Sequence, residues 1–550
     1  MKPTNNPLSD NSLWRYWRGL GGWNYYFLAK FGLLWFGYLN FHPLPNLVFM
    51  AFLLMPIPAL RLHRWRHYVA IPIGLALFYH DTWLPGINSI MSQGSQLTGF
   101  SAQYLLELTN RFINWQMVGA AFVMLIAYLF LAQWVRVTVF TVAALVWLNL
   151  VNIAGPAVSL LPASITASTS STPATTAPAA GGNSAPADSA PPTSANLTAY
   201  LNQFYDKEKA RATAFPATLP ADAQPFDLLV INICSLAWAD MDAVNLQNHP
   251  LWSKMDIMFD NFNSATAYSG PAAIRLLRAS CGQLSHHDLY QPVNQQCYLF
   301  DNLAKLGFKE QLMLDHSGVF GNFLKELREQ GDMQAPLMSQ AGISNELASF
   351  DGEPIYNDLD LLNRWLDQQQ KAGDARSATF FNIIPLHDGN RFVGSNKSAD
   401  YQPRAQKLFD QLNTFLEQLE KSGRKVMVVI VPEHGAALVG DKMQMSGLRD
   451  IPSPNITHTP VGIKLVGMKA PHQGSPLQIK TPSSYLALSE LVSRLVDGKA
   501  FTAPSVDWQA LTQNLPQTAV ISENDNAIVM QYQGKPYIRL NGGDWVPYPQ

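Results

Sequence analysis

Charged side chains are scarce in this sequence of 550 residues, because Asp, Glu, Lys and Arg make up only 14% of it. An ordinary soluble globular chain has about 25%. The 38 basic and 40 acidic residues leave a formal net charge of −2, so the chain lacks the basic excess of a general nucleic-acid binder. Hydrophobic residues reach 47%, which excludes a disordered or fibrous protein. A membrane protein and a globular protein with an uncharged linker would both show this composition.

The few charges divide the chain into three regions. Residues 1–155 contain nine basic and three acidic residues, residues 156–196 contain only Asp188, and residues 197–550 contain the rest. The middle region consists largely of Ala, Ser, Thr and Pro, a composition that cannot bury enough apolar surface to offset the entropy of ordering. We therefore expect a flexible linker between an N-terminal region and a C-terminal domain.

Five apolar runs lie in the N-terminal region, and each approaches the roughly 20 residues that a helix needs to cross a bilayer. They lie near residues 23–41, 44–60, 68–86, 117–135 and 137–154. A bundle of buried soluble helices would show polar faces, and the fourth run has almost none. The pattern predicts a transmembrane region of about five helices, and the four later runs argue against a cleavable signal peptide.

Most lysines and arginines of this region would share one side of the membrane. They are Lys2, Arg15, Arg18, Arg61, Arg64, Arg66 and Arg136. The loops of the other side contain Arg111 alone. The positive-inside rule then places the N-terminus in the cytoplasm, and five crossings place everything after residue 155 on the far side.

Short apolar runs alternate with helical patterns in residues 197–550. The expected strands are 226–234, 254–262, 311–316, 379–387, 425–434 and 461–467, and the expected helices include 402–421 and 483–496. This alternation predicts an α/β domain with a mostly parallel sheet and helices on both faces. Ligands of such folds bind beyond the carboxyl ends of the strands, so the polar residues there are candidates for a site. They are Cys234, His387, Asp388, Glu433 and His434.

The three cysteines all lie in the C-terminal domain. Cys281 and Cys297 are sixteen residues apart, and a disulfide closing such a loop is worth about 3 kcal/mol in an oxidising compartment. The alternative is two free thiols, which a periplasm disfavours. Cys234 is left unpaired at the end of a strand, where a lone cysteine more often packs than binds a ligand.

A second strand end adds two metal-binding side chains. Glu433 and His434 follow the apolar run VMVVIVP, and Gly435 permits a turn after them. An ordinary polar loop would look the same. With the soft ligand Cys234, however, the set favours zinc over magnesium.

Ser269 is the candidate nucleophile. In ATAYSGPAAIRLLRA, Pro271 suits the first turn of a helix, and Ser269 or Gly270 suits its N-cap. The alternative is a serine that only caps the helix. A helix N-terminus also stabilises a phosphoryl group, and a nearby zinc would lower the hydroxyl pKa.

Taken together, these residues resemble the alkaline phosphatase and sulfatase superfamily. A strand ends in a metal ligand, a serine follows about thirty-five residues later at a helix start, and a late strand ends in acid-His-Gly. Five spans and a tethered periplasmic domain resemble its membrane phosphoethanolamine transferases. Over essentially the whole chain, the sequence is similar to BcsG-type cellulose phosphoethanolamine transferases. The motifs are NICSLAWADMDA, NFNSATAYSGPAAIRLLRASCGQ, IPLHDGNRFVGSNKSADY and VPEHGAALVGDKMQMSGLRDIPSPNITHTPVGIK.

The resemblance implies roles for individual residues. It implies zinc ligands at Cys234, Ser269, Glu433 and His434, a substrate pocket with Tyr268, His387 and Arg449, and a disulfide between Cys281 and Cys297. His458 resembles a late histidine that many relatives use near the metal, although a structural histidine is about as common an outcome. Cys234 stands where Asp or Glu is usual, and Glu433 replaces the usual Asp. These departures favour one tightly bound zinc over a two-metal site.

The implied reaction is a ping-pong transfer in the periplasm, from an enzyme of the bacterial inner membrane. Ser269 takes phosphoethanolamine from phosphatidylethanolamine, and a glucose hydroxyl of nascent cellulose then accepts it. His387 would act as general acid and base, and Arg449 would neutralise the phosphoryl oxygens. The implied partners are the lipid bilayer, cellulose and other cellulose-synthase subunits, without nucleic acid. The alternatives are a membrane-anchored sulfatase or phosphodiesterase, and a non-catalytic subunit for cellulose-synthase assembly.

Overall fold

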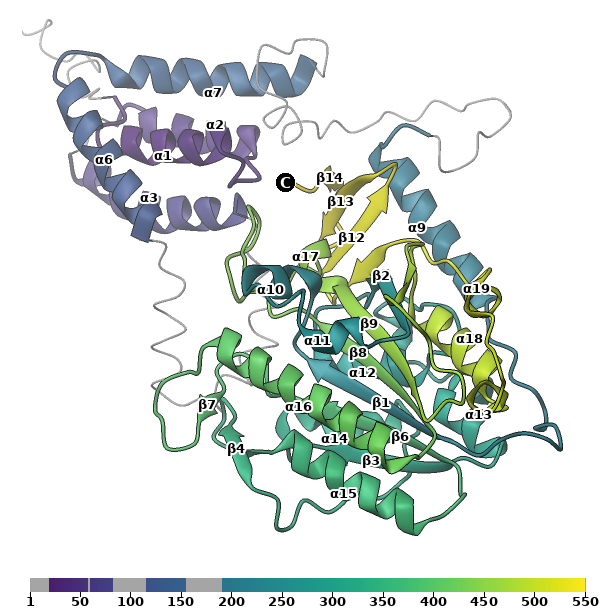
Figure 1. The fold of residues 1–550 in the computed structure, drawn as a ribbon. Helices are drawn as coiled ribbons and strands as arrows, with labels where there is room; N and C mark the ends of the chain where they lie inside the picture. The colour runs from purple at the N-terminus through teal and green to yellow at the C-terminus, as the bar shows by residue number, and fades with distance from the viewer. Residues whose placement is uncertain (1–18, 58–59, 83–114, 155–189, 550) are drawn as a thin grey trace, which may run out of the picture.

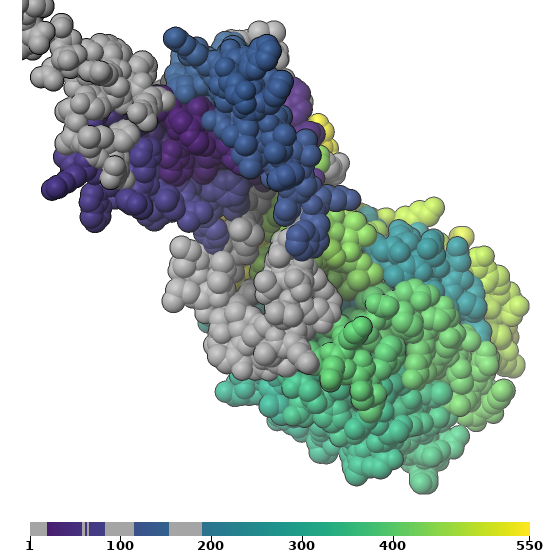
Figure 2. Space-filling model, turned by 90° about the vertical axis from the view of Figure 1, so that its left-hand side faces the viewer, coloured from purple at the N-terminus to yellow at the C-terminus, as the bar shows by residue number. Residues whose placement is uncertain are grey.

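The structure is a computed structural model that describes residues 19–57, 60–82, 115–154 and 190–549. Helices make up the N-terminal region, and an α/β domain makes up the C-terminal region (Figure 1). In Figure 2 the N-terminal helices, purple to blue, form a smaller body beside the larger C-terminal domain, teal to yellow. Residues 155–189, which include most of the predicted linker, lie outside the described residues, and helix α9 (Ser194–Lys209) begins shortly before the predicted boundary at residue 197.

Five helices lie at the five predicted apolar runs. They are α1 (Trp23–Trp35), α2 (Pro43–Leu54), α3 (Leu60–His80), α6 (Trp115–Leu131) and α7 (Val137–Ala154). Helix α3 begins eight residues before its predicted run and therefore includes Arg61 and Arg66. Within the described residues, no helix combines the length and the apolarity that crossing a bilayer requires. The transmembrane topology stays a prediction.

A fully buried polar network joins three of these helices. Lys30 of α1 and Asp81, directly after α3, are both 0% exposed, and Lys30 Nζ lies 2.5 Å from Asp81 Oδ2. Asn46 of α2 bridges them, because its Oδ1 accepts from Lys30 Nζ (2.7 Å) and its Nδ2 donates to Asp81 Oδ2 (2.6 Å). His42 Nδ1 lies 2.9 Å from the other carboxylate oxygen, and the His42 and His80 rings are 4.3 Å apart.

The C-terminal domain is built on a seven-stranded sheet with the order β10-β2-β9-β8-β1-β6-β3. Its strands are β1 (Asp227–Cys234), β2 (Ile257–Asn263), β3 (Lys309–Leu314), β6 (Ser377–Ile383), β8 (Val426–His434), β9 (His458–Val466) and β10 (Leu477–Ile479). All six predicted strands are present. The sheet is mostly parallel, as predicted, but β9 runs antiparallel to both β2 and β8. The sequence could not show this, because a strand buried on both faces has the same apolar pattern in either direction.

Helices cover both faces of this sheet, which confirms the predicted layers (Figure 1). Helices α12 (Ser269–Leu277), α13 (Leu299–Lys305) and α18 (Tyr485–Leu495) share one hydrophobic core with the sheet, and α15 (Asp358–Lys371) and α16 (Tyr401–Ser422) share the other. Neighbouring side chains of β8 divide between them, since Val429 enters the first core and Val428 the second. Each strand is thus buried on both faces, which is why its sequence is continuously apolar.

Two small sheets were not predicted. One consists of β11 (Ile521–Glu523), β12 (Ala527–Tyr532), β13 (Lys535–Leu540) and β14 (Trp545–Pro547), and the other of β4 (Asn345–Ala348), β5 (Pro354–Tyr356) and β7 (Arg391–Phe392). The first packs on α9 through a core that includes Leu201, Phe204 and Met530. The remaining α-helices are α10 (Trp238–Ala243), α11 (Pro250–Ser253), α14 (Phe323–Glu329), α17 (Pro454–Thr457) and α19 (Trp508–Thr512). Cys281 and Cys297 form the expected disulfide.

Candidate active site

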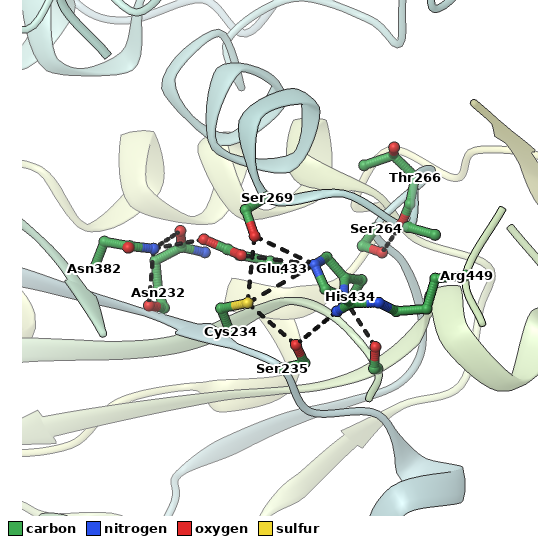
Figure 3. Close-up of polar contacts among 12 residues, drawn as sticks. Asn232, Cys234, Ser235, Ser264, Thr266, Ser269, Asn382, Glu433, His434 and Arg449 are labelled. Atoms are coloured by element: carbon green, nitrogen blue, oxygen red, sulfur yellow. Dashed lines mark hydrogen bonds and ion pairs between the residues drawn. The ribbon is translucent and has the colours of Figure 1, made fainter. Parts of the chain in front are cut away.

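The predicted metal ligands meet at the carboxyl edge of the main sheet. Strand β1 ends at Cys234 and the adjacent parallel strand β8 ends at His434, and these two residues are partners in the register. The ligand atoms of Cys234, Glu433 and His434 all lie within 4.8 Å of one another. Because parallel strands end at the same edge, two short motifs about 200 residues apart in the sequence form one cluster (Figure 3).

Ser269 lies against this cluster. Its Oγ is 3.3 Å from Cys234 Sγ and 3.4 Å from His434 Nε2. The expected capping role is wrong: Tyr268 is the N-cap of α12, and Ser269 is the first helical residue. The serine hydroxyl is therefore not used to cap the helix and points toward the thiol and the imidazole (Figure 3). All four predicted zinc ligands lie together.

Without a bound cation, burial shifts the pKa values of the three ligand side chains toward their uncharged forms. Burial raises the pKa of Cys234 to about 12, and the negative charge of Glu433 adds to this effect. Burial also raises the pKa of Glu433 and lowers the pKa of His434, which the positive charge of Arg449 lowers further. Without a cation the thiol and the carboxyl tend to keep their protons. A divalent cation among them would reverse this tendency, because it stabilises the thiolate and the carboxylate.

The residues fit a zinc ion. Glu433 Oε2 is buried and has no hydrogen-bond partner, so one carboxylate oxygen is left for a ligand. His434 Nδ1 lies 2.9 Å from the carbonyl oxygen of Gly435, so an Nδ1–H can donate there and leave the lone pair of Nε2 toward the cluster. A thiol, a carboxylate and an imidazole are the ligand types that zinc binds in proteins.

Two asparagines support Glu433, and the sequence reading missed both. Asn382 Nδ2 donates to Glu433 Oε1 (2.5 Å) and to Asn232 Oδ1 (2.9 Å). They are register partners on β1 and β6. Each interrupts a continuously apolar strand, in FDLLVINIC and TFFNIIPLH. A polar residue in a strand expected to be buried on both faces was the signal that could have revealed them.

Asp240 of α10 was also missed, and it fixes the loop that follows His434. Its buried carboxylate accepts hydrogen bonds from the backbone N–H groups of Ala436 (2.7 Å), Leu438 (3.2 Å) and Ala237 (2.9 Å). Burial nevertheless raises its pKa to about 6. This carboxylate ties the segment after β1 to the segment after β8, so it holds the two ligand-bearing strand ends together.

Three of the predicted substrate residues, Tyr268, His387 and Arg449, line one cavity of about 600 Å³ beside Ser269. Arg449 Nη1 lies 3.0 Å from Ser235 Oγ and 3.3 Å from His434 Nδ1, and the Tyr268 hydroxyl donates to Asp450 (2.8 Å). The His387 ring stacks on Phe350 with the centroids 4.6 Å apart.

His387 is a neutral imidazole with one ring nitrogen free to act as a base. Its Nδ1 lies 2.8 Å from the carbonyl oxygen of Asp388, so an Nδ1–H can donate there and leave Nε2 as a base. Burial lowers its pKa to about 4, and the positive charge of Arg449 contributes. The imidazole is therefore neutral near pH 7, as a general base must be before it acts.

His458 is the one predicted site residue that the structure does not bring to the others. It begins β9, its Nε2 contacts the carbonyl oxygen of Asp260 in β2, and it is not among the residues that line the cavity. The expected substrate contact is therefore not supported. A histidine that bonds to a neighbouring strand is the structural alternative that the sequence left open.

A serine hydroxyl beside a thiol, a carboxylate and an imidazole, at the carboxyl edge of an α/β sheet, is an arrangement that suits an enzyme of group transfer through the serine. Residues 181–545 match the family model of the Cellulose biosynthesis protein BcsG C-terminal domain, and residues 23–150 match that of the BcsG N-terminal domain. The chain belongs to the BcsG family, which confirms the resemblance seen in its motifs.

Curated relatives and solved structures complete the comparison. The Cellulose biosynthesis protein BcsG of Salmonella typhimurium strain LT2 is 65% identical, and that of Escherichia coli strain K12 is 64% identical; each alignment covers 100% of this chain and 99% of the relative. Among solved structures, an alkaline phosphatase superfamily protein from Vibrio parahaemolyticus is 12% identical and has a TM-score of 0.45, covering 64% of this chain and 87% of that chain. The soluble domain of lipooligosaccharide phosphoethanolamine transferase A from Neisseria meningitidis is 14% identical with a TM-score of 0.38, covering 53% and 92%.

Proposed function

We propose that this chain is a zinc-dependent transferase that moves phosphoethanolamine from phosphatidylethanolamine to glucose hydroxyls of nascent cellulose. The observation that carries the proposal is the position of Ser269 Oγ, 3.3 Å from Cys234 Sγ and 3.4 Å from His434 Nε2, at the edge of the 600 Å³ cavity. The cellulose acceptor is supported by membership of a family whose relatives are named cellulose biosynthesis proteins.

In the first half-reaction, the Ser269 Oγ–phosphorus bond forms while the bond from phosphorus to the diacylglycerol oxygen breaks. A zinc ion held by Cys234, Glu433 and His434 would lower the pKa of the Ser269 hydroxyl. The Arg449 guanidinium, in the same cavity, neutralises negative charge on the phosphoryl oxygens. Backbone N–H groups in the first turn of α12 add to this stabilisation.

In the second half-reaction, a glucose hydroxyl attacks the phosphoserine, so that a new oxygen–phosphorus bond forms and the serine–phosphorus bond breaks. His387 takes the proton of the incoming hydroxyl and returns it to Ser269. In the first half-reaction the same imidazole passes the Ser269 proton to the departing diacylglycerol oxygen. Such a general acid and base contributes typically about 10²–10⁴-fold to the rate.

The proposed setting is the inner membrane, with the C-terminal domain in the periplasm and the linker between them. The apolar surface of α6 supports a lipid environment, because none of its side chains is buried and Phe122, Ile126 and Phe130 are each more than half exposed. A membrane position would bring the site to a lipid donor and to a polymer that emerges from the cellulose synthase, whose other subunits are the proposed partners.

The test uses the full chain in phosphatidylethanolamine vesicles with a cello-oligosaccharide as acceptor, followed by mass spectrometry of the sugar. We expect the sugar to gain the mass of one phosphoethanolamine group. Ser269→Ala should lower this product at least about 10³-fold, and Ser253→Ala, at an exposed serine of α11, should not.

Other outcomes identify the other functions. Free phosphoethanolamine without a modified sugar would indicate a hydrolase. If neither product forms and the chain binds no zinc, the function is that of a non-catalytic assembly subunit. Without acceptor, a peptide containing Ser269 should carry the phosphoethanolamine mass.

A further inference from the structure

Several carboxylates line the cavity without a role in the proposed reaction, and Glu326 is one of them. Glu326 of α14 is partly exposed and lines the same cavity as Ser269 and Arg449. In the described part of the chain, no lysine, arginine or histidine forms an ion pair with it; one turn later on the same helix, Glu329 pairs with Lys325 at 3.8 Å. Glu326 is thus a carboxylate that faces the cavity and has no direct ion-pair partner among the described residues.

Glu326 also lies directly against the residue that follows the nucleophile. A Cβ atom at Gly270 would come within 2.2 Å of Glu326 Oε2. Only the missing side chain of Gly270 gives the carboxylate this space. The carboxylate of Glu326 therefore lies beside Gly270, next to the nucleophile. The guanidinium of Arg449 lies in the same cavity, where it contacts Ser235 and His434.

Tyr290 completes this part of the cavity. Tyr290 lines the cavity together with Glu326. Burial raises the pKa of Tyr290 to about 12, and the negative charge of Glu326 adds to this effect. A carboxylate and an aromatic ring thus line the same cavity. A carboxylate together with an aromatic face is a combination that binds an ammonium group.

We propose that Glu326 binds the ammonium of the transferred phosphoethanolamine and so selects aminoethyl phosphoryl groups over uncharged ones. This inference rests on the proposed function. A phosphoethanolamine group carries a negative phosphoryl end and, two carbons beyond an ester oxygen, a positive ammonium. With the phosphorus at Ser269, the phosphoryl end meets Arg449 and the ammonium meets Glu326. A headgroup of the same size without the amine leaves Glu326 unpaired, which is the basis of the discrimination.

Two soluble chromogenic diesters separate this role from a general effect on catalysis. They are nitrophenyl aminoethyl phosphate and nitrophenyl ethyl phosphate, which differ only by the terminal amine. With the full chain, Glu326→Gln should lower kcat/KM for the aminoethyl ester by about 10- to 100-fold and leave the ethyl ester nearly unchanged. Glu326→Asp should restore part of the preference. Glu329→Gln, the matched control on the exposed part of the same helix, should change neither ester.

The remaining outcomes are distinguishable. An equal loss on both esters, or no loss on either, overturns the role of Glu326 while the proposed function stands. If the unmodified chain releases nitrophenol from neither ester and also transfers nothing from phosphatidylethanolamine, the proposed function fails, and the role of Glu326 fails with it. An unchanged Tm of the Glu326→Gln chain shows that the ratio of the two rates reports recognition and not folding.

Discussion

The two regions of the molecule each contain a buried cluster of polar side chains, and the clusters differ in their charge balance. In the N-terminal helices, Asp81 faces Lys30 at 2.5 Å, so the carboxylate has its counter-charge in the protein. In the C-terminal domain, Glu433 lies beside Cys234 and His434, and its Oε2 has no hydrogen-bond partner. Both clusters bring ligand atoms within 4.8 Å. The carboxylate of the first cluster has a counter-charge from the protein, and the carboxylate of the second leaves one oxygen without a hydrogen-bond partner.

The location of each cluster fits this difference. The Lys30 network joins three helices and has no exposed lysine or carboxylate surface, so it holds the helices together. The Cys234 cluster lies beside a cavity that also contains Ser269 and Arg449, so a bound cation would be reached by a substrate. In these two clusters, the carboxylate that the protein pairs with a lysine joins helices, and the carboxylate without such a partner lies beside the cavity.

The largest expected effect comes from removing the charge of the uncompensated cluster. Glu433→Gln has the same shape and keeps an oxygen for Asn382, but it loses a charged metal ligand. We expect loss of the bound zinc and a fall in phosphoethanolamine transfer of at least about 10³-fold. In a chelator, this variant should be about as stable as the unmodified chain, because burial already favours the uncharged carboxyl of Glu433 when no cation is bound. Metal analysis and the Tm in chelator check this, and full zinc occupancy in the variant would contradict it.

Removing a charge from the compensated cluster should have the opposite effect on stability. Lys30→Met leaves Asp81 buried without its counter-charge, which costs about 3–5 kcal/mol. The double variant Lys30→Met with Asp81→Leu should be clearly more stable than Lys30→Met alone. Unfolding of the full chain in detergent measures both. Lys325→Met, at a lysine side chain that is 65% exposed, is the control and should change little. Equal stability of the single and double variants would show that the ion pair is not coupled.

A smaller effect should appear as a pH dependence near the uncompensated cluster. The pKa of Asp240 is raised by burial from 3.8 to about 6, so the folded chain keeps this proton after the unfolded chain has lost it. The resulting stability is fully present below pH 4, falls between about pH 4 and 6, and is constant above, a loss of up to about 3 kcal/mol. Asp240→Asn should lack this part of the slope when chelator-treated chains are compared across that range. Parallel curves for the two chains would contradict the assignment.

For the last prediction we expect no change in zinc content, and this outcome distinguishes the two clusters most directly. The double variant His42→Ala with His80→Ala removes two metal-binding side chains beside Asp81, and we expect the zinc content of the full chain to stay unchanged, because Lys30 already holds the position of a cation. His434→Ala, in the other cluster, should remove the zinc. A fall in zinc content for the His42 and His80 variant would show that the compensated cluster also binds metal.

Much of the fold was predictable because burial leaves a strong pattern. All six expected strands are present, as are the helices expected at residues 402–421 and 483–496, found as α16 and α18. The direction of β9 and the two small sheets were not predictable. A short strand such as β4 or β14 has too few residues to show a period, and strand direction depends on the connections between elements.

For the candidate site, residue types and strand ends indicated Cys234, Ser269, Glu433 and His434, and the structure places them together. The residues that support them were harder to identify. Asn382 and Asp240 act through contacts with residues far away in the sequence, so their neighbours in the chain do not show what they contact. His458 failed for the complementary reason, because a motif that resembles a site cannot show which neighbour a side chain will contact.

The sequence by itself determined the three regions, the alternation of strands and helices, and the polar residues that end the apolar strands, because hydropathy and backbone preferences are local properties. The tertiary structure decided which of those ends meet, which buried charges are neutralised, and that Glu326 lies against Gly270 beside the nucleophile. The physical reason is that charge balance and space depend on distances of a few ångströms between segments that lie up to hundreds of residues apart in the sequence. Only the folded chain sets those distances.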